Sequence, residues 1–139
     1  MFQPLAGKRV IETTQVLAGP YCTYQLALMG AEVIKIEKPG QGDWTRQGGQ
    51  DPELKAAGLP LSFLTQNAGK KSVTLDLKTE KGLAILKDLV KDSDVFIENF
   101  RPGTAAKLGI AYEDLAPLNE RLVYASLSAY GQDGPIGPV

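Results

Sequence analysis

The sequence predicts an α/β fold: a Rossmann-like parallel sheet with helices on both faces, formed by a single domain over residues 1–139. Three observations support this prediction. Short β-branched segments alternate with helical ones, which is typical of a parallel sheet covered by helices. A chain of 139 residues suits one domain. A content of 43% hydrophobic and 22% charged residues is typical of a globular chain.

The first part of the chain predicts a strand, a helix and a second strand. The β-branched segment 9–14 is the first strand. Gly19-Pro20 begins the helix, because proline at the first helical position lacks only an N–H that would have no partner there. Gly30 ends the helix, because glycine readily adopts the left-handed cap conformation. Residues 31–37 form the second strand.

The remaining chain begins with an irregular stretch. Residues 40–70 are rich in glycine and polar residues, and we expect an excursion from the core with one helical turn. The later elements are a strand at 72–77, a helix at 79–92 capped by Thr79, a strand at 94–100, two short helices or turns, and a strand at 121–131. Right-handed crossovers predict the strand order 3-2-1-4-5, with a ligand crevice between the first and fourth strands.

The composition excludes several kinds of site. The chain has no histidine, so a Ser-His-Asp triad, a Cys-His pair and a histidine-bearing zinc site are impossible within it, and we predict no metal site. Cys22 is the single cysteine, which we expect to be a small buried residue in a reducing compartment. The net charge of −1 predicts no nucleic-acid partner, and no apolar run approaches the ~20 residues of a membrane span. We therefore predict a cytoplasmic protein.

Features around the expected crevice leave two interpretations open. The helix start at Gly19 could bind a phosphate through free N–H groups, or could simply be a tight turn. Glu37 follows Gly19 at nearly the spacing of a ribose-binding acid, but a dinucleotide fingerprint needs three glycines, so a solvated strand end is favoured. Lys70, Lys71 and Lys78 could converge on a phosphorylated ligand or form an ordinary basic surface.

Two segments near the end of the fourth and fifth strands add further candidates. Asn99 and Phe100 would suit a purine, although Phe100 could equally be a core residue. Tyr124 and Tyr130 are expected to be packing residues of the last strand.

Four segments, taken together, resemble a known family. They are "PLAGKRVIETTQVLAGPYCTYQLALMGAEVIKIEKPGQGDWTR", "NAGKKSVTLDLKTEKG", "DVFIENFRPG" and "LGIAYEDLAPLNERLVYASLSAYGQDGP". In this order they resemble the N-terminal part of the class III coenzyme A transferases, which include formyl-CoA:oxalate and carnitine CoA-transferases and the related 2-methylacyl-CoA racemases. The resemblance covers nearly the whole sequence. It implies an incomplete N-terminal fragment of a longer chain, with the fold of an interlocked-dimer CoA-transferase.

The resemblance implies that coenzyme A or an acyl-CoA binds as a substrate and that no cofactor is tightly held. The residues at the family's CoA-contacting positions are Val16, Leu17, Ala18, Lys38, Leu75, Lys78, Asn99, Phe100, Arg101 and Lys107. The family often has arginine where Lys38 and Lys107 stand, so the charge is kept but bidentate geometry is lost. Some members carry glutamine at Leu17.

The family's chemistry runs through an aspartate that attacks the acyl-CoA thioester, and that residue is expected beyond Val139. The resemblance therefore implies acyl-CoA and carboxylic acid partners, a homodimer of the full-length protein, and an inactive 139-residue segment. A 2-methylacyl-CoA racemase, a non-catalytic nucleotide-binding module and a nicotinamide oxidoreductase remain alternatives. The sequence does not name the acyl donor or the acceptor.

Overall fold

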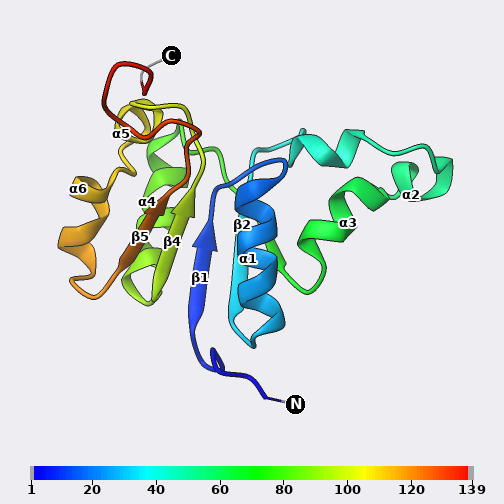
Figure 1. Cartoon of the computed structure of the whole chain (residues 1–139), viewed down its shortest axis with the longest axis horizontal. Coiled ribbons are helices and arrows are strands. Elements are labelled where there is room, and N and C mark those ends of the chain that lie inside the picture. Colours follow the sequence, from blue (N-terminus) through cyan, green and yellow to red (C-terminus); the bar gives the residue numbers. More distant parts are fainter. Residues whose placement is uncertain (1, 138–139) are drawn as a thin grey trace.

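The computed structural model describes residues 2–137 as a five-stranded, all-parallel sheet with helices on both faces (Figure 1). The strand order is β3-β2-β1-β4-β5, which confirms the predicted topology. The strands are β1 (Arg9–Glu12), β2 (Glu32–Glu37), β3 (Lys71–Thr74), β4 (Val95–Glu98) and β5 (Val123–Ser126). The helices are α1 (Ala18–Leu28), η1 (Trp44–Gln47), α2 (Pro52–Ala56), α3 (Leu61–Asn67), α4 (Glu80–Lys91), α5 (Thr104–Leu108), α6 (Tyr112–Leu115) and η2 (Ala116–Leu118). Each strand is shorter than predicted, because pairing stops where the loops diverge.

One face of the sheet is covered by α4, α5 and α6. Ile11 of β1 and Phe96 of β4 are fully buried there, against Leu86 and Val90 of α4. Thr79 caps α4 as predicted, and its Oγ1 accepts a hydrogen bond from the Gly82 N–H at 3.1 Å. This side holds the larger of the two apolar clusters.

The opposite face is covered by α1 and α3. Val10 and Val33 are buried beneath α1, and side chains alternate between the two faces, as the pleat requires. Cys22 is only half-buried against this cluster, so the prediction of a buried residue was wrong. Further along the same face the strands carry charged residues in place of apolar ones, a feature the sequence analysis did not anticipate.

The excursion between β2 and β3 is more regular than predicted. It contains η1, α2 and α3, so the expectation of one helical turn was wrong. Asp43 and Asp51 cap η1 and α2 by accepting backbone N–H groups, and Pro52 follows at the first helical position. The α3 helix packs against α1, which ties the excursion to the sheet.

Two tyrosines near β5 behave differently. Tyr124 is a packing residue as predicted: its ring lies 5.3 Å from that of Phe96, and its hydroxyl donates to the Ile110 carbonyl at 3.1 Å. Tyr130 is 67% exposed and lies beyond β5, so the packing role was wrong. Within residues 2–137, no helix combines the length and apolar character that a membrane crossing requires.

Candidate functional site

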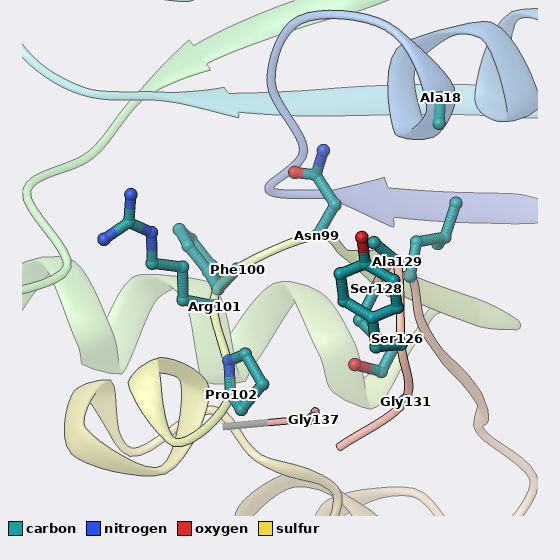
Figure 2. Close-up of a pocket in the computed structure, with 12 residues that line it drawn as sticks. Ala18, Asn99, Phe100, Arg101, Pro102, Ser126, Ser128, Ala129, Gly131 and Gly137 are labelled. Carbon is teal, nitrogen blue, oxygen red and sulfur yellow. The ribbon is translucent and has the colours of Figure 1, made fainter. Parts of the chain in front are cut away.

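The loops after β1 and β4 lie side by side where the strand order reverses. The Gln15 N–H donates to Asn99 Oδ1 at 3.0 Å, and Asn99 Nδ2 donates to the Gln15 carbonyl at 2.9 Å. Figure 2 shows Asn99 extending toward the loop that precedes α1. The Asn99 amide thus joins the two loops as a peptide group would.

A large open crevice, here called the β4–β5 cavity, lies on one side of this junction. It measures about 760 Å³ and is lined by Ala18, Asn99, Phe100, Arg101 and residues 126–131 (Figure 2). Ala18 belongs to the first turn of α1, whose N-cap has no side-chain hydrogen bond. The first turn of α1 therefore borders this cavity without a side-chain cap.

A smaller hollow, the β2–β3 cavity, lies at the carboxyl ends of β2 and β3. It measures about 250 Å³, and Lys38, Leu75, Lys78 and Phe100 line it. Leu75 is buried, whereas the two lysines are exposed. Phe100 lines both cavities, so they adjoin across a single aromatic ring.

Three of the ten candidate residues line neither cavity. Val16 and Leu17 lie between Gln15, which lines the β2–β3 cavity, and Ala18, which lines the β4–β5 cavity. Lys107 is exposed on α5. Seven candidates therefore gather around two adjoining hollows, and three lie at their margins.

Val16 has an unusual backbone conformation, with φ at +72°. This left-handed region costs a β-branched residue roughly 1–2 kcal/mol. Such strain persists only where the surrounding structure fixes the backbone, and it concentrates at functional sites. Nothing in the sequence pattern indicated it.

Glu37 is not a solvated strand end, and that interpretation was wrong. Its side chain is almost fully buried and accepts hydrogen bonds from Arg46 Nε and Nη2 at 2.6 Å, from Ser72 Oγ at 2.6 Å and from the Asp43 N–H at 2.7 Å. Burial alone would raise the Glu37 pKa, but these donors outweigh it and lower the pKa from 4.5 to about 2. With its carboxylate engaged in this way, Glu37 is not available to bind a ribose, which removes the main support for a nicotinamide enzyme.

A buried polar layer lies beneath α1 and α3, and the sequence analysis missed it. The layer consists of Glu12, Lys35, Glu37, Asp43, Arg46 and Lys70. Its three carboxylates balance its three cations, as burial requires. A signal was present in the sequence, because Glu12 and Lys35 interrupt strands of a parallel sheet that buries both faces.

Lys70, Lys71 and Lys78 do not line one common cavity, contrary to one interpretation of the sequence. Lys70 Nζ lies 2.9 Å from Glu12 Oε1 in the polar layer, and burial lowers the Lys70 pKa against the opposing effect of Glu12. Lys71 pairs with Glu32. Of the three lysines around β3, Lys78 alone lines the β2–β3 cavity.

Gly19 is required by packing. A Cβ atom on Gly19 would lie 2.4 Å from Thr14 Cβ, inside the distance that carbon atoms tolerate. The glycine therefore lets the first turn of α1 approach the end of β1 closely. This supports the tight-turn interpretation, and it leaves the N–H groups of that turn beside the β4–β5 cavity.

The doubly wound sheet, with loops meeting at the switch point, defines the class as a Rossmann-like α/β fold. The chain belongs to CoA-transferase family III, whose family model matches residues 5–137. It is 48% identical over 133 residues to the acetyl-CoA:oxalate CoA-transferase of Acetobacter aceti, a match that covers 96% of this chain and 33% of that protein. It is 47% identical over 135 residues to the succinate–glutarate CoA-transferase of Agrobacterium fabrum, covering 95% of this chain and 34% of that protein.

Solved structures agree with this assignment. The orthorhombic form of Rv3272 from Mycobacterium tuberculosis superposes with a TM-score of 0.89 at 45% identity, covering 99% of this chain and 38% of that one. A CAIB/BAIF family protein from Brucella suis gives a TM-score of 0.89 at 39% identity, covering 99% and 36%. The chain thus spans about a third of the length of these relatives.

Proposed function

We propose that this chain is the CoA-binding part of an enzyme that transfers CoA between an acyl-CoA thioester and a carboxylic acid. The supporting observation is the pair of adjoining cavities at the carboxyl end of the sheet, joined at Phe100. Coenzyme A has an adenosine-phosphate end and a long pantetheine arm. Two adjoining hollows of unequal size, with Lys38 and Lys78 at the smaller one, suit such a bipartite anion.

The residues divide into two groups by chemistry. Lys38 and Lys78 offer ammonium groups to the phosphates of the adenosine end, and Leu75 and Phe100 offer apolar surface to the base. Arg101 and the first turn of α1 favour negative charge in the β4–β5 cavity.

The three candidate residues at the margins of the cavities, together with Asn99, complete the proposed site. Val16 and Leu17 form the rim between the cavities, and Lys107 adds charge from α5. Asn99 contributes by holding the two loops together.

The catalytic carboxylate is proposed to be an aspartate that follows Val139 in the full-length protein. Asp133 lies within a glycine-rich segment, and we do not assign it this role. The relatives named above are CoA-transferases whose names include succinate, glutarate and oxalate, and we infer a carboxylic acid acceptor here by analogy. Residues 1–139 form a domain of this enzyme, which we propose to be a cytoplasmic, interlocked homodimer.

Isothermal titration of residues 1–139 tests the proposal. CoA binds and NAD does not, and Lys78→Met weakens CoA binding about fivefold, as removal of a phosphate contact worth ~1 kcal/mol implies. Lys55→Met is the matched control, because Lys55 is exposed on α2 and lines neither cavity. NAD binding without CoA binding refutes the proposal, and CoA transfer by residues 1–139 alone refutes the placement of the nucleophile.

A further inference from the structure

We propose that Glu12, Lys35 and Lys70 are positioning residues, whose buried ion network holds the β1–α1 loop (residues 13–17) in its ligand-binding shape. The ligand readout of this inference rests on the proposed function, whereas its structural readout does not.

The network forms hydrogen bonds with Thr14, near the start of the loop. Lys35 Nζ donates to the Thr14 carbonyl at 2.7 Å, and Thr14 Oγ1 donates to Glu12 Oε2 at 2.7 Å. Thr14 is itself fully buried. Both the backbone and the side chain of this residue are therefore fixed two positions before Val16.

The same network forms hydrogen bonds with α1, the helix that follows the loop. Lys70 Nζ donates to the Pro20 carbonyl at 2.8 Å and to Glu12 Oε1 at 2.9 Å. Thr23 Oγ1 donates to Glu12 Oε2 at 2.5 Å. Glu12 thus connects the end of β1 with α1, directly at Thr23 and through Lys70 at Pro20, and the loop is anchored at both ends.

Between these anchors the loop adopts the strained conformation at Val16. Such a conformation persists only when neighbouring contacts determine it. On the outer side, the Asn99 amide holds Gln15. On the side facing the sheet, the buried ion network holds the loop. Lys35 of β2 contacts Thr14 near the start of the loop, and Lys70, at the end of the excursion, contacts Pro20 after it.

Burial makes these contacts rigid. Glu12 and Lys35 are at most 1% exposed, and the Lys70 side chain is 2% exposed. Without water nearby, neither the carboxylate nor the ammonium groups can exchange partners cheaply. A loop fixed in this way presents the rim between the two cavities in one shape, which reduces the ordering cost of binding.

Two substitutions at Thr14 separate positioning from simple packing. Thr14→Val keeps the volume and removes the hydroxyl donor, whereas Thr14→Ser keeps the donor. Neither leaves a buried charge unpaired. Lys35→Met removes the contact to the Thr14 carbonyl together with the ion pair to Asp43. Thr65→Val, on the exposed side of α3, is the control.

The experiment combines NMR and calorimetry on residues 1–139. Backbone chemical shifts report the sign of φ at Val16, and titration reports CoA affinity. Thr14→Val and Lys35→Met should move Val16 out of positive φ and weaken CoA binding about tenfold, as loss of a buried hydrogen bond implies. Thr14→Ser and Thr65→Val should behave as the unmodified chain.

Folded Thr14→Val with Val16 still at positive φ overturns the inference. An equal change in Thr14→Ser also overturns it, because shape and not the hydroxyl would then hold the loop. If Lys35→Met does not fold, Thr14→Val decides. If the unmodified chain does not bind CoA, the proposed function fails, but the Val16 shifts still decide the positioning role.

Discussion

Replacing Glu37 by glutamine should remove a defined part of the pH dependence of folding. Glu37 is buried and bound by Arg46 through two hydrogen bonds, and its pKa falls from 4.5 to about 2. At about 1.36 kcal/mol per pKa unit, this shift corresponds to about 3 kcal/mol of folding free energy. Because the folded-state pKa is depressed, the contribution is fully present above pH 4.5 and is lost as the pH falls toward 2.

Urea denaturation of the unmodified chain and of Glu37→Gln, at several pH values between 7 and 2, measures this contribution. At pH 7 the variant should be less stable by about 3 kcal/mol or somewhat less, because Arg46 is 23% exposed and can recover hydration. The difference between the two proteins should shrink below pH 4.5. Glu120→Gln is the control, since Glu120 is exposed and should change stability by less than about 0.5 kcal/mol. Parallel stability curves over the whole pH range would refute the reasoning.

Three further substitutions test the α4 side of the sheet, each by urea denaturation at pH 7. Gly82→Ala would place a Cβ atom 2.1 Å from the Asp76 carbonyl oxygen, and it should cost about 3 kcal/mol or more because neither backbone can move aside. Thr79→Ala removes the α4 cap and should cost about 1 kcal/mol, whereas Thr79→Ser should cost less. Tyr124→Phe leaves the Ile110 carbonyl without its donor and should cost about 1–2 kcal/mol. Unchanged midpoints would contradict each expectation.

The topology could be predicted because it follows from local patterns and one chirality rule. Alternation of strands and helices gave a parallel sheet, and right-handed crossovers gave the order of its strands. The order also placed the loops after β1 and β4 side by side, although Asn99 joins these loops and the two cavities lie on either side of the junction. The strand ends could not be predicted, since pairing depends on where neighbouring strands leave the sheet.

The excursion was underestimated, although its sequence held the required information. Asp51 followed by Pro52 is a helix start, and the structure uses it for α2. The glycine content of residues 40–70 is typical of irregular structure and masks this local signal. The α3 helix is stabilised by its tertiary contact with α1, and no local sequence pattern reports such a contact.

The candidate site was predicted only as far as the family resemblance extended. Seven of the ten residues named from the resemblance line the two cavities, but the inward direction of Lys70 and the burial of Glu37 were not predicted. Charge counts cannot separate a lysine that binds a ligand from one that balances a buried carboxylate. The alternation of side chains along β1 and β2 puts Glu12 and Lys35 on a face of the sheet that helices cover, where buried charges require partners.

The excursion has one practical consequence for protein engineering. The excursion is held near its two ends by ion pairs, one between Asp43 and Lys35 and the other between Lys70 and Glu12. Its middle, around α2, buries no side chain of that helix. A foreign peptide grafted into α2, before the Gly58 carbonyl that accepts a hydrogen bond from Arg46 Nη1 at 2.8 Å, would therefore be displayed from a fixed base, with the contacts to the sheet unchanged.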